Sequence, residues 1–309
     1  MNKLDDKNNN IYLYELKKEL NLFLKLFEDD NFPKVSLLSG RKGIGKFTLI
    51  LFFLNNIFNQ KKSFFNKKFI EKDSIFYNQI LLKTDSNIIY LNNENHNIKI
   101  EDIRELKKTL QKTSISNLPR FIILDDVELF NASSLNAMLK IIEEPNHNNY
   151  FILINNEERK ILETIKSRCL ETKIILNNSS RIKIIDSLLI DSPMTVVIDY
   201  NNSDITPGNF LKYNKICLDN KIDLNNSYFI EIAKILKFYK KDKNLHFVNL
   251  AYFFTEQFFY KKALLEKGHI NYLNSTKIKF LKYINDFVTY NLNLESVINF
   301  MQTNFKYEK

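Results

Sequence analysis

Residues 40–48 combine glycine and lysine in a spacing that can bind phosphate. The segment reads GRKGIGKFT and matches the phosphate-loop pattern G-x-x-x-x-G-K-[ST] at Gly40, Gly45 and Lys46, with Gly43 as a third glycine. In such a loop, backbone N–H groups surround phosphate oxygens, the lysine neutralises their charge, and the final hydroxyl binds Mg²⁺. The segment therefore predicts a phosphate site between a strand and a helix.

The end of this segment departs from the pattern. Phe47 stands where the Mg²⁺-binding hydroxyl belongs, and a phenyl ring has no oxygen to offer a hard cation. Thr48 comes one residue late, which on a helix is a rotation of roughly 100°, so we expect it to point elsewhere. The loop thus predicts weak ATP or ADP binding, or an empty site. As a lone motif, it is equally typical of a glycine turn in an ordinary α/β protein.

Two carboxylates follow a fully apolar run. Asp125 and Asp126 come directly after residues 121–124, which favour a central parallel strand. Nucleotide hydrolases with a phosphate loop place an Asp for Mg²⁺ at such a strand end, often followed by a Glu that activates water. Asp126 is one methylene shorter than that Glu, so its reach as a base is reduced. The alternative is a pair of acidic residues that cap a strand at the surface.

Arg168 lies between Ser167 and Cys169, in a turn after a short helix predicted for 161–166. An arginine in such a turn can reach across a subunit interface to a phosphate held by a neighbour and stabilise transition-state charge in trans, as an arginine finger does. The alternative is a surface arginine paired with a local acid.

Alternating strands and helices must position these groups. Asn131 is a plausible N-cap of the helix that Pro145 ends. The pattern predicts a doubly wound α/β domain with a parallel sheet that ends near residue 176. The expected strands are 35–38, 88–91, 121–124, 151–154 and 172–176, and the clearest expected helices are 11–28, 48–58 and 101–111.

Composition limits the class of protein. The net charge of +9 is mostly lysine spread along the chain, which indicates either compositional drift over solvated faces or attraction to DNA phosphates. Two cysteines and four scattered histidines are too few for a disulfide framework or a zinc site, so we expect no metal. The N-terminus lacks a signal-peptide core, and residues 48–58 are too short to span a bilayer. We expect a cytoplasmic, nucleoid-associated protein with no membrane partner.

Several segments together carry a family resemblance. The run NAMLKIIEEP at 136–145, followed by 151–155 and 164–169, resembles the bacterial DNA polymerase III clamp-loader subunits of the AAA+ superfamily. Residues 40–48, 103–106 and 121–128 also look like that family. The resemblance covers roughly residues 20–176, and it covers the remainder only by domain order and by the sequence Thr206-Pro207-Gly208.

Departures from the family pattern indicate which kind of subunit the chain resembles. Motor (gamma/tau) subunits of this family carry an intact loop, an Asp-Glu pair, a four-cysteine zinc module and a nucleotide-sensing arginine in the lid. This chain lacks the hydroxyl, the Glu and any cysteine between 49 and 168, and it has no arginine after Arg181. Delta subunits are not expected to carry Ser-Arg-Cys. The chain therefore resembles delta-prime subunits, largely rigid ring members whose arginine, here Arg168, acts on the adjacent motor, and zinc is not implied.

The resemblance implies a three-part architecture and a set of partners. We expect an AAA+ domain over 1–176, a small helical lid over 177–223 and an all-α collar for oligomerisation over 224–309. The implied partners are gamma/tau and delta subunits in a hetero-oligomeric ring and, through that assembly, the sliding clamp and primer–template DNA. Two alternatives stay open: an ATP-hydrolysing motor subunit that uses Lys46 and Asp125, and a DNA-binding module driven by charge.

Overall fold

The computed structural model describes residues 10–58, 69–82, 84–92, 98–111 and 118–305. The chain divides into two compact units. The first runs to Pro193 and includes Thr206–Gly208, and the second comprises Met194–Ile205 and the chain from Asn209 onward. The expected division at 176 and 223 stays a prediction.

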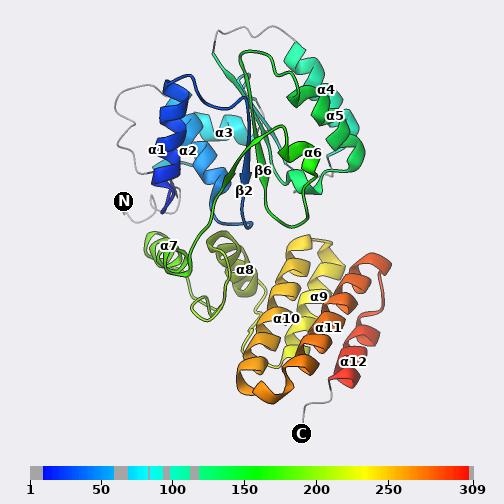
Figure 1. The fold of residues 1–309 in the computed structure, drawn as a ribbon. Helices are drawn as coiled ribbons and strands as arrows, with labels where there is room; N and C mark the ends of the chain where they lie inside the picture. The colour runs from blue at the N-terminus through cyan, green and yellow to red at the C-terminus, as the bar shows by residue number, and fades with distance from the viewer. Residues whose placement is uncertain (1–9, 59–68, 83, 93–97, 112–117, 306–309) are drawn as a thin grey trace. The chain divides into compact units, whose positions relative to one another are not determined.

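A five-stranded parallel sheet forms the centre of the first unit (Figure 1). Its strand order is β4-β5-β6-β2-β7, so consecutive strands are joined by crossovers. A separate antiparallel pair joins β1 and β3. The strands are β1 (Asn10–Tyr12), β2 (Val35–Ser39), β3 (Phe69–Glu71), β4 (Ile88–Leu91), β5 (Arg120–Leu124), β6 (Asn149–Asn155) and β7 (Leu170–Lys173).

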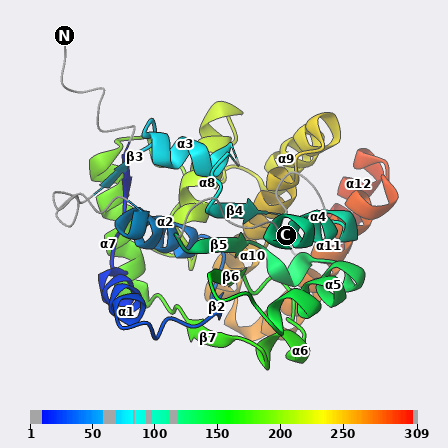
Figure 2. The ribbon, with the colours of Figure 1, turned by 90° about the horizontal axis from the view of Figure 1, so that it is seen from above.

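The central strands are buried on both faces because their side chains alternate. Phe121 and Ile123 belong to one apolar cluster, whereas Ile122 and Leu124 belong to the other. Helices α1, α2 and α3 cover the first face, and α4, α5 and α6 cover the second (Figures 1 and 2). The predicted α/β fold is confirmed. These helices are α1 (Lys17–Glu28), α2 (Lys46–Phe58), α3 (Ile75–Leu81), α4 (Ile100–Gln111), α5 (Ala132–Ile142) and α6 (Glu163–Lys166), with a 3-10 turn at Val127–Leu129.

Local signals explain where two of these helices begin. The side-chain oxygen of Asn131 accepts a hydrogen bond from the Ser134 N–H at 2.8 Å, so the predicted N-cap of α5 is confirmed. Helix α2 begins at Lys46, inside the glycine loop, and its apolar side chains are buried from Leu49 to Leu54. The loop is therefore fixed at one end by a buried strand and at the other by a buried helix.

Some element boundaries differ from the sequence-based predictions. Strand β7 begins at Leu170, two residues before the expected 172–176, because backbone pairing with β2 defines it rather than the apolar residues that follow. Helix α1 begins at Lys17, later than expected. The sequence pattern indicates neither α3 nor β1, because both are short and weakly periodic.

The chain beyond the sheet is helical. Helix α7 (Asn178–Asp191) lies in the first unit, and α8 (Pro207–Asp219) runs from the first into the second. In the second unit, α10 packs against α9 and α11, and α12 packs against both of those helices. The predicted helical C-terminal region is confirmed. Its helices are α9 (Tyr228–Asp242), α10 (Leu245–Leu265), α11 (Ile270–Tyr290) and α12 (Leu294–Asn304), with a 3-10 turn at Lys267–His269. Among the described residues, no helix has the length and apolar character needed to cross a membrane.

Matched leucine substitutions in the first unit test the packing that holds the loop. Leu54 in α2 is fully buried, whereas Leu22 in α1 is 52% exposed. Leu54→Ala leaves a cavity and should lower the free energy of unfolding by about 2–5 kcal/mol, measured by urea titration followed by tyrosine fluorescence. Leu22→Ala should change it by less than about 0.5 kcal/mol. Equal effects of the two substitutions would contradict this packing.

Candidate functional site

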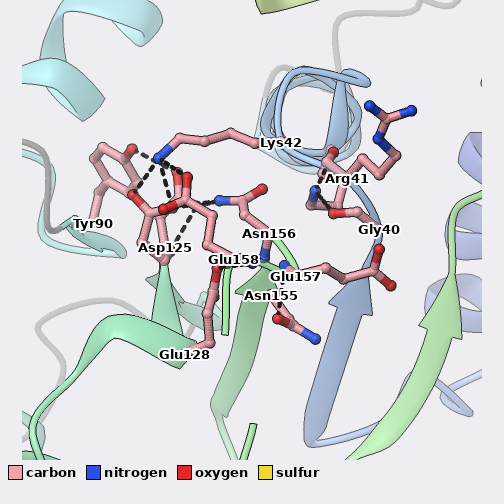
Figure 3. A network of polar contacts seen from close by, with 12 residues as sticks. Gly40, Arg41, Lys42, Tyr90, Asp125, Glu128, Asn155, Asn156, Glu157 and Glu158 are labelled. Atoms are coloured by element: carbon pink, nitrogen blue, oxygen red, sulfur yellow. Dashed lines mark hydrogen bonds and ion pairs between the residues drawn. The ribbon is translucent and has the colours of Figure 1, made fainter. Parts of the chain in front are cut away.

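Three strand ends meet at one edge of the sheet. Because β2, β5 and β6 are parallel and in register, their carboxyl ends lie side by side, with Leu38 opposite Ile154 and Leu124 opposite Leu153. Gly40, Asp125 and Asn156 follow directly. This edge is where open α/β sheets bind ligands, and Figure 3 shows the polar side chains gathered there.

The glycine loop keeps the geometry of a phosphate site. Gly43 and Gly45 adopt φ values of 84° and 99°, which favour glycine. The buried Lys46 donates hydrogen bonds to the Gly40 and Arg41 carbonyls, the latter at 2.9 Å. Burial lowers the pKa of Lys46 to about 8, against the opposing charge of nearby carboxylates. The Lys46 ammonium thus lies among the carbonyls of the loop, and phosphate binding there stays a prediction.

The residue at the altered loop position packs against an aromatic ring. Phe47 lies with its ring centroid 4.7 Å from that of Tyr90 in β4. The Tyr90 hydroxyl donates to Asp125 Oδ2 at 3.2 Å. Thr48 is half-buried as the third residue of α2, and its expected direction stays a prediction. Phe47 therefore contacts Asp125 only indirectly, through Tyr90. The ring at position 47 offers no hydroxyl to this carboxylate.

The two aspartates are brought together with a lysine that the sequence analysis did not select. Asp126 adopts a left-handed conformation (φ 55°), and its side chain is 3% exposed. Lys42 Nζ lies 3.1 Å and 3.3 Å from the two Asp126 carboxylate oxygens and 3.0 Å from Glu158 Oε1. The surface alternative for Asp126 is therefore wrong, because this carboxylate is buried in an ion pair.

The two asparagines at the end of β6 have separate partners. Asn156 Nδ2 donates to Asp125 Oδ1 at 3.1 Å and to Asp126 Oδ1 at 2.6 Å. Asn155 Nδ2 donates to Ser39 Oγ at 3.1 Å, at the entrance to the loop. Asn156 is thus the residue that links the two aspartates. The sequence could not show which of the two adjacent asparagines has this role.

The Glu128 carboxylate binds backbone N–H groups at this edge of the sheet. Its Oε1 accepts the backbone N–H groups of Asn156 at 3.0 Å and Glu158 at 3.4 Å. Burial raises its pKa above the usual range, although these hydrogen bonds oppose the shift. Glu128, Lys42, Tyr90 and Glu158 were missed because their roles depend on contacts between strands and loops that are distant in sequence.

The segment Thr206–Gly208 closes onto the loop from a distant part of the sequence. Thr206 Oγ1 donates to the Lys42 carbonyl at 2.7 Å, and the Gly208 N–H donates to the Gly43 carbonyl at 2.8 Å. A Cβ atom on Gly208 would stand 2.9 Å from the Gly43 Cα atom, so only glycine permits this approach. The segment therefore binds the carbonyls of two successive loop residues, 42 and 43.

The residues present fit a phosphate better than they fit Mg²⁺. The loop supplies a lysine and no hydroxyl at position 47, and the aspartates already have ammonium, amide and hydroxyl partners. Within the described ranges, no group of three or more His, Cys, Asp or Glu side chains is placed to hold a metal ion. The arrangement can hold an anion at Lys46 without an obvious place for a divalent cation.

The Ser-Arg-Cys turn follows α6 and is separate from these carboxylates. Cys169 packs against the apolar core, and burial raises the pKa of its thiol to about 12, so it anchors rather than reacts. Ser167 Oγ donates to the Thr164 carbonyl at 3.1 Å. Arg168 remains partly exposed and binds Glu143 Oε1 through two N–H groups, at 3.0 Å and 2.6 Å. In the single chain, Arg168 therefore pairs with a local acid, as the alternative interpretation of the sequence predicts.

A basic groove lies between α4 and α5. Its volume is about 360 Å³, and its lining includes Arg104, Lys107 and Lys140 together with Ser133 and Asn136. Arg104 also lies 3.9 Å from Glu101 of its own helix, a weak exposed pair. The sequence showed only dispersed lysines, whereas helix packing gathers three cations along one groove.

The family comparison and the curated relatives point to DNA polymerase III subunits. The family described as "DNA polymerase III, delta subunit" matches residues 16–177, slightly more than half of the chain. The DNA polymerase III subunit gamma of Buchnera aphidicola subsp. Schizaphis graminum is 29% identical over 138 residues, which are 42% of this chain and 38% of the relative.

Delta-prime subunits from several bacteria also match. The protein from Bacillus subtilis is 25% identical over 48% of this chain and 44% of its own length. The one from Buchnera aphidicola subsp. Baizongia pistaciae is 31% identical over 28% of this chain and 25% of its own length. The chain thus spans less than half the length of these curated relatives. A gamma subunit-related protein from Thermotoga maritima has a TM-score of 0.46 at 17% identity, over 92% of this chain and 99% of its own.

The titration of Asp125 gives a test of the site geometry. Burial raises the pKa of Asp125 to about 6, and the charge of Asp126 adds to the shift. Between about pH 4 and pH 6 the folded chain therefore binds a proton that the unfolded chain has lost. Stability should fall as the pH rises through this window, by up to about 3 kcal/mol from this group.

The substitution Asp125→Asn removes this contribution. Urea titrations at a series of pH values should show a shallower fall in the free energy of unfolding for Asp125→Asn than for the wild type. Glu128 contributes a slope of the same sign in both proteins, so the slope is reduced rather than abolished. Identical pH dependence of the two proteins would show that Asp125 is not buried as described.

Proposed function

The chain belongs to the DNA polymerase III delta-subunit family, a clamp-loader family, and we propose that it serves as a delta-prime-like ring subunit. In this role it supplies Arg168 to an adjacent ATP-hydrolysing subunit and hydrolyses no ATP itself. The observation that best supports the proposal is the contrast between its two sites. Arg168 is presented on an anchored turn, whereas the chain's own nucleotide site has Phe47 and a lysine-paired Asp126.

The contacts of Arg168 suit transfer to a neighbour's phosphate. Its guanidinium binds Glu143 and the Thr164 carbonyl at the surface, and its side chain is 34% exposed. Exposed ion pairs are weak, typically about 0–1 kcal/mol, so Glu143 can be exchanged for a competing anion. A γ-phosphate carries more charge than a carboxylate and accepts the same planar N–H pattern. Cys169 and Ser167 hold the turn, while Arg168 provides the chemistry.

The partners follow from this role. We propose a hetero-oligomeric ring with gamma/tau and delta subunits that loads the sliding clamp onto primed DNA in the cytoplasm, at the nucleoid. The basic groove between α4 and α5 fits the phosphate backbone of the primer–template, since it presents Arg104, Lys107 and Lys140 together. The collar helices α9–α12 form the expected contact surface within the ring.

A motor subunit is the second candidate. The 29% identity to a gamma subunit over 138 residues favours it, as do the lysine at position 46 and the aspartate at position 125. It requires Mg²⁺-dependent hydrolysis by the chain's own loop. The buried pairing of Asp126 and the phenyl ring at position 47 make it the weaker candidate.

Removal of the guanidinium tests the proposed role of the turn. In a loader reconstituted with gamma/tau, delta, clamp and primed DNA, Arg168→Ala should leave assembly intact and reduce clamp loading by roughly tenfold or more. Arg159→Ala removes another exposed arginine of the same unit and serves as the control. Normal loading by the Arg168→Ala assembly would exclude the trans role.

Charge removal in the α4–α5 groove tests the DNA contact. Replacement of Arg104, Lys107 and Lys140 by alanine should weaken binding of the assembled loader to primed DNA. The slope of log K against log salt should decrease by roughly 2 to 3, as expected when about three phosphate contacts are lost. Alanine at Lys17, Lys18 and Lys25 of α1, outside the collar, removes the same charge elsewhere. Equal slopes for these two variants would exclude the groove.

A further inference from the structure

The nucleotide site contains its own cation. We infer that the Lys42 ammonium, together with the Tyr90 hydroxyl, takes the place that a divalent cation would need at Asp125 and Asp126. The chain thereby excludes Mg²⁺–nucleotide through both Lys42 and Phe47 rather than through Phe47 alone. This inference does not depend on the action of Arg168, because it concerns only the chain's own loop.

The first support is the direction of Lys42. This residue lies in the glycine loop, yet its side chain points across the site to the carboxylates (Figure 3). Its Nζ contacts both oxygens of Asp126 and one oxygen of Glu158 within 3.3 Å. An ammonium at this place neutralises the carboxylates between which a metal ion would otherwise bind. A divalent cation would have to displace it against direct charge repulsion.

The second support is the degree of burial. The Asp126 side chain is 3% exposed, so without Lys42 its charge would be left largely uncompensated in a poorly solvated place. The Lys42 ammonium has two carboxylates within 3.3 Å, those of Asp126 and Glu158, and supplies this compensating charge.

The third support is the coupling between Phe47 and Tyr90. The Phe47 ring packs on Tyr90, and the Tyr90 hydroxyl donates to Asp125. A threonine at position 47 would offer an oxygen to a metal ion, but the Lys42 ammonium would still be paired with Asp126. The loss of the hydroxyl at 47 and the gain of internal donors are thus two parts of one arrangement.

The fourth support is the fixed backbone beneath Lys42. Thr206 binds the Lys42 carbonyl, and Gly208 binds the next carbonyl along the loop. These contacts hold the loop backbone in the conformation from which the Lys42 side chain reaches Asp126. The internal cation is therefore held by the fold and does not depend on a freely moving surface side chain.

Nucleotide binding by paired variants tests this inference. Titration calorimetry of the full chain with ATP, in Mg²⁺ and in EDTA, should show no Mg²⁺-dependent gain for the wild type or for Phe47→Thr. Phe47→Thr combined with Lys42→Gln should bind ATP at least about tenfold more tightly with Mg²⁺ than without. Phe47→Thr with Lys18→Gln removes the same charge from an exposed site on α1 and should behave as Phe47→Thr alone.

The outcomes separate the explanations. An equal Mg²⁺-dependent gain in Phe47→Thr alone, or in the wild type, would overturn the role of Lys42. A folded double variant without the gain would overturn it too. If Lys42→Gln prevents folding, the addition of Asp126→Asn removes the ion pair as a whole and leaves Asp125 for the metal ion. That triple variant should show the same gain, and its absence would also overturn the inference.

Discussion

The positions of the glycine loop and of the two aspartates both depend on the parallel register of the buried strands. Because β2, β5 and β6 run in the same direction and share one edge, the glycine loop, the aspartates and the asparagines must meet there. The alternating side chains of β5 bind this sheet to helices on both faces. A change in one residue of this polar edge must therefore be balanced by its neighbours.

The balance at this edge shows how the carboxylates of a phosphate-loop fold can be compensated without a metal ion. Buried carboxylates without a cation are costly, and the cost falls on the folded state. Here Lys42 compensates Asp126, while Tyr90 and Asn156 compensate Asp125. The arrangement frees the site from any need for a metal ion. The proposed trans chemistry is placed instead on the turn at Arg168, whose contacts are exposed and exchangeable.

The sequence could predict what is local and periodic. The loop, the strand ends and the Asn131 cap follow from short patterns, and the structure confirms the α/β fold and these elements. The internal cation could not be found this way, because Lys42 and Asp126 are 84 positions apart and one loop lysine looks like another. Edge strand β7 was misplaced, since pairing on one side defines it more than its own side chains do.

The central claim is that this chain acts on a neighbour's nucleotide and not on its own. The most direct measurement is single-turnover ATP hydrolysis by a reconstituted loader that contains either Arg168→Ala or Lys46→Met in this subunit. Our account predicts that Arg168→Ala slows hydrolysis by roughly tenfold or more, whereas Lys46→Met leaves it unchanged. Slow hydrolysis with Lys46→Met and normal hydrolysis with Arg168→Ala would contradict the account and identify the chain as a motor.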